Sequence, residues 1–207
     1  NNPTTLASGV VLQSTAGNLS APGAVVATAG PVTLRAAGNV VFQNAANDFA
    51  TVAINAGANV AIRDVNAVDL GASSVGGSLS LVAGGAVTDS GAISVAGATT
   101  ISAGAANDVM LDNLNDFAGN VAVQSGRNAR LNDINNLTLD FSSFGTLTAT
   151  AAGTVTLAGP LTATGAGDAI VLSGSRFVNN AGAGALSASG GRWLVWSSNA
   201  NPFGGAT

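Results

Sequence analysis

The chain has 207 residues, of which only 8% are charged, and its formal net charge is −4. All six basic residues are arginine, all ten acidic residues are aspartate, and His, Tyr and Cys are absent. The acidic balance argues against a nucleic-acid-binding protein, because a phosphate backbone would be repelled. The lack of cysteine excludes a disulfide framework and a thiolate metal site. No apolar run approaches the ~18 residues that a membrane span requires, so none is expected.

In chain order, the predicted elements are short strands of alternating β-branched or leucine residues, separated by Gly, Ala or Asn. The first seven are Val10–Leu12, Val25–Val26, Val32–Leu34, Val40–Phe42, Val52–Ile54, Val60–Ile62 and Val68–Leu70. The series continues to Trp193–Trp196. Glycines between the strands supply the turns, and no amphipathic stretch predicts a helix. The residues expected to point inward include Val32, Leu34, Val40, Phe42, Ile93, Val95, Leu161 and Ala163.

Each strand is too short to bury a hydrophobic face alone, whereas stacked repeats share one continuous core. The chain also contains a longer internal repeat, in which Asn47–Ala50 recurs as Asn115–Ala118, and Ile62–Asn66 recurs as Leu131–Asn135. About nine strands lie within one such repeat, and three strands per coil would give coils of roughly 23 residues.

The sequence therefore predicts an all-β protein, a β-solenoid of about nine coils. We expect residues 1–207 to form one unit, with irregular ends at about 1–8 and 198–207. Because neither terminal coil carries a distinct polar cap, we also expect the unit to be part of a longer protein.

Four segments carry a family resemblance: Gly38–Phe42, Leu131–Leu139, Ser175–Asn180 and Gly191–Ser197. They resemble the filamentous haemagglutinin-like adhesins of Gram-negative bacteria. The resemblance implies a single-stranded right-handed parallel β-helix, secretion to the cell surface and adhesive work. It also implies an outer-membrane two-partner secretion transporter as the export partner. The Asn-Pro-Asn-Gly-type signature of the family's export module is missing, which favours a stalk segment.

Aspartates are the only candidates for acid–base chemistry. The pairs suggested by the sequence are Asp64 with Asp69, Asp112 with Asp116, and Asp133 with Asp140. An enzyme that cleaves polysaccharides would need such carboxylates on an outer face. A Ser-His-Asp triad and a phosphate-binding loop are excluded, since His and Lys are absent. The neighbouring asparagines favour the alternative that these aspartates close turns.

Two segments, Gly104–Leu111 and Gly165–Ile170, each resemble one copy of a nonapeptide calcium-binding turn. Such sites need tandem copies so that successive turns share the ion. These copies lie far apart, so ordinary Gly/Asp corners are favoured, and no metal or cofactor is expected.

Threonines alternate in several strands, which are Thr146–Thr150, Thr154–Thr156 and Thr162–Thr164. Flat threonine rows could bind ice or a mineral surface. The spacing places these strands on successive sides of one coil, which favours exposed strands without such a function.

Trp193 and Trp196 are expected on opposite sides of the last strand. One can cover the end of the core while the other stacks on a sugar beside an arginine. The speculative ligand contacts are therefore Trp196 and Arg192, and the alternative is that both tryptophans cover the last coil. Arg127 and Arg130 either form a small anion patch or pair with nearby aspartates.

The sequence thus predicts a non-enzymatic segment of a large secreted adhesin. It would serve as a stalk and as a docking surface for polysaccharide or surface proteins. One alternative is a β-helical polysaccharide lyase or hydrolase that uses outward aspartates. A second is an ice or mineral surface binder, which requires threonine rows in register over at least four coils.

Overall fold

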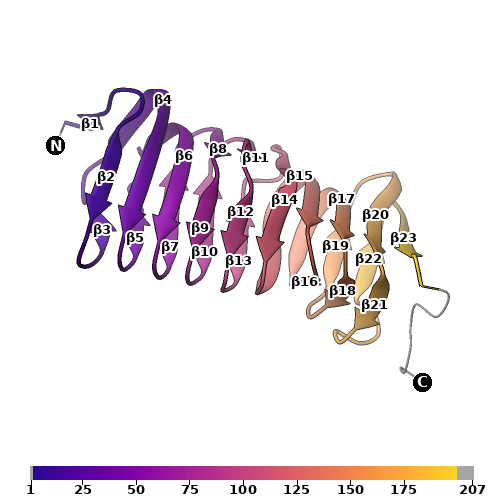
Figure 1. Ribbon diagram of the computed structural model, residues 1–207. Coiled ribbons are helices and arrows are strands. Elements are labelled where there is room, and N and C mark those ends of the chain that lie inside the picture. The colour runs from indigo at the N-terminus through magenta and orange to yellow at the C-terminus, as the bar shows by residue number, and fades with distance from the viewer. Residues whose placement is uncertain (1, 200–207) are drawn as a thin grey trace.

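The computed structural model describes residues 2–199 and shows a rod of stacked parallel strands, with no helix in that range (Figure 1). Ten strands pair one after another along the rod, so the chain makes ten coils. At about 4.8 Å per step the rod is ~43 Å long. The ten strands of this first sheet are β2 (Val11–Ser14), β4 (Val25–Ala36), β6 (Asp48–Ala56), β8 (Val68–Leu70), β11 (Val87–Asp89), β14 (Val109–Phe117), β15 (Asn120–Asp133), β17 (Ser142–Ala151), β20 (Gly167–Gly174) and β23 (Gly191–Ser197).

A second sheet of parallel strands runs along the rod and includes the first part of β15. Its other strands are β3 (Leu19–Ser20), β5 (Val40–Phe42), β7 (Val60–Asp64), β10 (Leu79–Ala83), β13 (Thr99–Ser102), β16 (Leu137–Leu139), β18 (Thr154–Leu157) and β21 (Arg176–Asn179). The remaining strands, which pair within the first sheet, are β1 (Thr4–Thr5), β9 (Ser73–Val75), β12 (Ile93–Val95), β19 (Leu161–Ala163) and β22 (Leu186–Ala188). The predicted class, an all-β parallel solenoid, is confirmed.

The coils are mostly shorter than predicted, and there are ten instead of nine. An average coil takes roughly 20 residues, whereas the prediction assumed roughly 23. Coil length also varies, because the partners on successive coils are as close in sequence as Val52 and Leu70 and as far apart as Leu161 and Leu186. The prediction divided the internal repeat into three coils, and the repeat is in fact longer than three coils.

The repeat advances by more than three full coils. Three coil-to-coil steps lead from Val60 through Leu79 and Thr99 to Val121. The counterpart of Val60 in the next repeat is Ala129, which follows Val121 by roughly one third of a coil. Ala129 accordingly lies in the first sheet, between β14 and β17, whereas Val60 lies in the second. Each repeat is therefore rotated with respect to the one before it.

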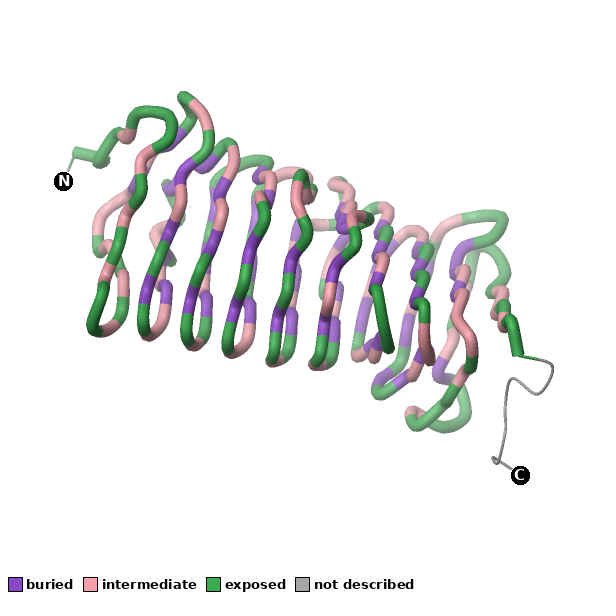
Figure 2. Tube along the Cα trace, in the orientation of Figure 1, coloured by how far each residue is buried: buried purple, intermediate pink, exposed green. Residues whose placement is uncertain are grey.

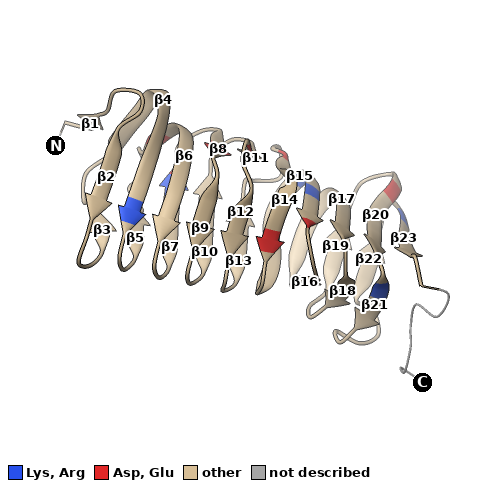
Figure 3. Cartoon of the chain, viewed as in Figure 1, with Lys and Arg blue, Asp and Glu red and all other residues tan. Residues whose placement is uncertain are grey.

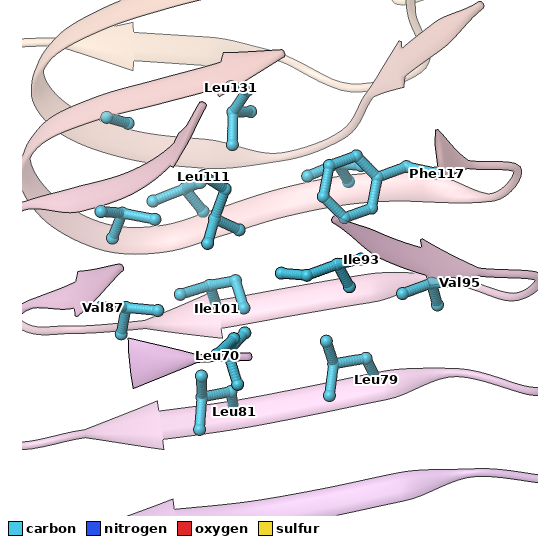
Figure 4. Packing of buried hydrophobic residues seen from close by; sticks show 14 of the residues in the cluster. Leu70, Leu79, Leu81, Val87, Ile93, Val95, Ile101, Leu111, Phe117 and Leu131 are labelled. Atoms are coloured by element: carbon cyan, nitrogen blue, oxygen red, sulfur yellow. The ribbon is translucent and has the colours of Figure 1, made fainter. Parts of the chain in front are cut away.

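Burial alternates along most strands (Figure 2). Successive side chains of a strand point to opposite faces, so the buried ones face the interior. Charged residues are few and scattered along the rod (Figure 3). All eight residues predicted to point inward are at most 1% exposed. Aliphatic side chains stack from coil to coil in the interior, with Leu70, Leu81, Ile101 and Leu111 among them (Figure 4). Each buried side chain of this size contributes ~1.5–3 kcal/mol to stability.

Seven polar or charged residues are buried within the described chain, and six of them form two sets of three. The first inner polar set is Asn47, Asp64 and Ser73. The second inner polar set is Asn115, Asp133 and Ser142, which are the counterparts of the first three in the internal repeat. The seventh residue is Thr99.

Every member of the two inner polar sets accepts a backbone N–H from the preceding coil. In the first set the acceptor and donor pairs are Asn47 Oδ1 and Val25 (2.9 Å), Asp64 Oδ2 and Phe49 (2.7 Å), and Ser73 Oγ and Ile54 (3.0 Å). In the second set they are Asn115 Oδ1 and Ile93 (2.8 Å), Asp133 Oδ2 and Phe117 (2.9 Å), and Ser142 Oγ and Val123 (2.9 Å). These side chains supply acceptors for backbone donors inside the rod, where water cannot.

The ends of the unit were predicted to be irregular at about 1–8 and 198–207. Thr4 and Thr5 form β1, so part of the N-terminal stretch is a strand. Asn1 and residues 200–207 lie outside the described residues.

Candidate binding surface

Outward side chains on successive coils lie in rows, because their strands pair in register. One row runs along the first sheet through Gln13, Arg35, Asn55, Ser74 and Ser94. None of these five side chains makes a hydrogen bond or ion pair within the described residues. We call this set the open polar row. It offers amide, guanidinium and hydroxyl groups, all unoccupied, at intervals of about 4.8 Å.

A shallow groove of about 420 Å³ follows the middle of the open polar row. Arg35, Asn55 and Ser74 contribute to its lining, together with Ala53 and Ala72. Arg35 is the one charged residue that lines it. The alanines keep the floor low, so the longer polar side chains stand along the groove.

The turns of successive coils stack closely beside Ala72, which lines the groove. A Cβ atom at Gly91 would overlap the backbone nitrogen and Cα of Ala72 on the preceding coil. Glycine is therefore required at this position for steric reasons.

The turn asparagines form a second row, in which the side chains are already bonded. Asn18 Oδ1 accepts from the backbone N–H of Asn39 (2.8 Å), and Asn39 Oδ1 accepts from that of Asn59 (3.0 Å). Asn59 Oδ1 in turn accepts from the N–H of Ser78 (2.9 Å). These amides stabilise the stacked corners and have less capacity left for a ligand than the open polar row.

Two of the predicted acid–base candidates, Asp64 and Asp133, lie inside the rod and are 2% and 1% exposed. Burial raises the pKa of both carboxyls, against the opposing effect of the two backbone N–H groups that each accepts. The idea of outward carboxylates is therefore wrong for these two residues. The turn interpretation is correct in part, because Asp64 Oδ1 accepts from Asn66, and Asp133 Oδ1 from Asn135.

The other predicted candidates are on the outside and are bonded to separate partners. Asp69 accepts from the hydroxyls of Thr88 and Ser90, and Asp112 lies 3.6 Å from the Arg130 guanidinium. Asp116 accepts from Asn135 Nδ2 at 2.9 Å, and Asp140 from Asn120 Nδ2 at 2.9 Å. In two of the three predicted pairs one carboxyl is buried and the other is not, and in the third pair Asp112 and Asp116 bind different partners.

In Gly104–Leu111, the first of the two segments that resemble a calcium-binding turn, Asp108 forms an ion pair with Arg127. Asp108 accepts two hydrogen bonds from the Arg127 side chain, at 2.9 and 2.6 Å, and a further one from Asn128 Nδ2. The hydrogen bond from Arg127 lowers the pKa of Asp108, and the pairing raises the pKa of Arg127. Arg127 and Arg130 therefore pair with aspartates, as one of the two predictions had it. Among residues 2–199, no group of three or more Asp, Glu, His or Cys side chains could hold a metal ion.

The two tryptophans lie on the last strand, β23, and point to opposite sides as predicted. Trp193 pairs with Ile170, which faces the core, and it lies beside Phe177 at the end of the described core. Trp196 pairs with Ser173 on the outer side. Their exposed fractions are 52% and 59%.

Arg192 forms an ion pair with Asp168 of the second calcium-like turn, with 2.5 Å between Nε and Oδ1. Both side chains are on the surface, and the pairing raises the pKa of Arg192. A ligand role for Arg192 and Trp196 stays a prediction, and such a ligand would compete with Asp168.

The threonine strands do not build the rows that an ice-binding or mineral-binding surface requires. Thr148 lies between Arg130 and Val171 on the neighbouring coils. Thr156 pairs with Thr138, which gives two coils in register instead of four. Within residues 2–199, the threonines are therefore scattered over several sides of the rod.

The fold and the repeated inner contacts define a β-solenoid repeat protein. Three consecutive stretches, residues 2–55, 57–124 and 126–207, match the family model described as "Repeats of unknown function (DUF5649)". Because these matches cover nearly the whole chain, the protein belongs to this repeat family. The second and third matches are offset from each other by one internal repeat, so the two divisions of the chain agree.

No curated protein and no solved structure matches the chain. In the part of the chain that the structure describes, no helix has the length and apolar character needed to cross a membrane.

The open polar row was missed by the sequence reasoning. The spacing of its members is uneven and follows the pairing of successive coils. A search for outward polar side chains at a spacing of roughly 20 positions would have found them, but the assumed spacing of roughly 23 does not bring them together.

Proposed function

We propose that the chain is a rigid spacer segment of a secreted surface adhesin and that its outer surface docks polysaccharide. The observation that carries this proposal is the unbroken column of ten paired strands, which makes the whole described chain one rod. A rod of ~43 Å is suited to holding a binding surface away from a cell envelope.

The surface composition supports this role. Charged residues are only 8% of the chain, and several of the aspartates are occupied by hydrogen bonds or ion pairs within the rod. Most polar groups on the outer surface of the rod are therefore neutral hydroxyls and amides. Such groups match the hydroxyl-rich surface of a polysaccharide through hydrogen bonds in both directions.

Export through an outer-membrane two-partner secretion transporter is part of the proposal, and it rests on the sequence resemblance. A chain without cysteine cannot be trapped by disulfides while it crosses the envelope unfolded. Coils stacked on their sequence neighbours can fold one after another as the chain emerges.

Surface display tests the proposal. The chain is placed between a two-partner secretion module and an epitope tag, and intact cells are labelled with antibody. We expect labelling only when the transporter is present. Retention of the fusion inside the cell, with the transporter present and the module alone exported, would count against the exported-rod proposal.

Docking is tested separately on a glycan array, with reducing sugar ends measured in the same wells. The proposal expects bound protein and no increase in reducing ends. An increase in reducing ends would show that the chain cleaves polysaccharide, which contradicts the spacer proposal. The outer aspartates would then be the residues to mutate.

A further inference from the structure

We infer that the open polar row binds a linear acidic polysaccharide along the rod axis, with a sugar carboxylate on Arg35. This inference deepens the proposed docking function and rests on it. The ligand is a linear sugar chain that carries both hydroxyl groups and carboxylates, as a polyuronate does.

The first argument is hydrogen-bonding capacity. A folded protein normally bonds its polar side chains to itself or to water, and the turn asparagines of this rod bond to each other's backbone. Gln13, Arg35, Asn55, Ser74 and Ser94 form five consecutive positions with no such internal partner. Their donors and acceptors are therefore available to a ligand without breaking any contact of the rod.

The second argument is geometry. Consecutive members of the row sit on strands paired in register, so they are about 4.8 Å apart and follow one another along the rod. This spacing is comparable with the length of one pyranose ring in a linear chain. The low alanine floor at Ala53 and Ala72 leaves room for the rings between the polar groups.

The third argument is charge. Arg35 is exposed, has no ion-pair partner, and is the one charged residue in the groove lining. A guanidinium presents paired donors that fit a carboxylate, and such charge-assisted bonds are the strongest the row can make. A neutral sugar chain would leave this group without a counter-charge.

Asp116 marks where the site ends. It follows Ser94 in the same row and is already bonded to Asn135. It is four coils from Arg35, or ~19 Å, which exceeds the ~8 Å screening length at physiological salt. Its charge therefore does not cancel the attraction at Arg35, although it disfavours extension of an acidic chain past Ser94.

The test compares polygalacturonate with its methyl ester, which has the same backbone without the charges. Binding to the purified chain is measured by affinity electrophoresis at low and at physiological salt. We expect binding to the acid form, weakening with salt, and about tenfold weaker binding for Arg35→Gln. Equal affinity for the ester, or no effect of Arg35→Gln, would overturn the inference.

Arg63→Gln is the matched control, because Arg63 is also exposed and without an ion-pair partner but lies on β7 of the second sheet. It should bind like the unmodified chain, and equal thermal midpoints establish that both variants are folded. A loss equal to that of Arg35→Gln would show non-specific charge attraction and would overturn the assigned row.

A second pair of variants blocks the groove without touching Arg35. Ala72→Glu puts a carboxylate into the groove and should abolish binding, whereas Ser80→Glu puts the same charge on the exposed side of β10 and should leave it nearly unchanged. Retained binding in Ala72→Glu would rule out the groove. If the chain is displayed on cells but binds no polygalacturonate, this inference fails while the spacer proposal stands.

Discussion

The two inner polar sets sit in equivalent surroundings, but the surfaces above them differ. Asp64 and Asp133 each accept two backbone N–H groups, from equivalent residues. The asparagine and the serine of each set each accept one. On the outside, Arg63 corresponds to Asn132. Arg35 has no arginine as its counterpart, because Ala103 and Gly104 lie at the offsets of 68 and 69 that relate the two repeats. The guanidinium of the open polar row therefore has no counterpart in the next repeat, whereas the inner contacts occur twice.

Even inside the rod the two sets are not identical. The Asn47 amide donates to the carbonyls of Phe42 (3.0 Å) and Arg63 (3.2 Å). The Asn115 amide donates instead to the carboxylate of Asp89 (2.8 Å). The acceptor role toward the preceding coil is retained and the donor role is variable. This difference indicates that satisfying the backbone donors of the preceding coil is the fixed requirement of the repeat.

The largest effect is expected from removing whole units of the rod. Deleting residues 57–125 removes one complete repeat and brings Asp133 under Phe49 and Ser142 under Ile54, in place of Asp64 and Ser73. We expect a shorter rod that unfolds cooperatively in urea, with retained β-sheet circular dichroism.

Deleting residues 60–120 is the matched control, because it removes three complete coils but not a repeat. Phe49 and Ile54 then lose their side-chain acceptors, and we expect unfolding or aggregation. If both deletions fold equally well, the pairing of strands between successive coils is sufficient for stacking. The inner contacts of the repeat then have no separate role.

The next effect is the loss of one inner acceptor. Asp64→Ala and Asp133→Ala each leave two backbone N–H groups without a partner, and each should lower the free energy of unfolding by about 2–4 kcal/mol. The two values should agree if the sets are equivalent. Urea denaturation measures them, with Asp69→Ala as an outer control expected to cost less than ~1 kcal/mol. A cost for Asp64→Ala no larger than this control would contradict the role given to the inner sets.

Acid should stabilise the rod through the same two residues. Burial raises the native pKa of Asp64 and Asp133 above the ordinary value of 3.8, so the native state binds protons more tightly than the unfolded chain. This contribution to stability is present below pH 3.8 and is lost as the pH rises through the raised native pKa values.

We therefore expect the urea midpoint to rise between pH 7 and pH 4. The lowered pKa of Asp108 acts in the opposite direction, but that carboxyl is at the surface and its effect is screened. Asp108→Asn should make the rise slightly larger. A midpoint that falls on acidification would show that the backbone hydrogen bonds outweigh burial.

The sequence predicted what depends on local pattern. Alternation identified the inward residues, and the recurrence of Asn47–Ala50 identified the repeat. The coil length could not be predicted from the repeat, because one repeat does not contain a whole number of coils. Residue-to-residue register follows from coil length, so neither the bond from Asp64 to Phe49 nor the open polar row could be predicted. The bond from Asp64 to Asn66 was within reach, since it spans two residues.

Thr99 is the exception among the buried polar residues, and it gives the smallest expected effect. Its hydroxyl has no hydrogen-bond partner in the described structure, and it lies between Leu79 and Val121 in an otherwise aliphatic ladder. Valine has nearly the same shape, so Thr99→Val should raise the free energy of unfolding by about 1 kcal/mol. Replacing Ser73 with alanine should have the opposite sign, because Ser73 Oγ is bonded to Ile54. If Thr99→Val also destabilises the rod in urea, the hydroxyl is bonded in solution, and the distinction between bonded and unbonded inner polar groups fails at that position.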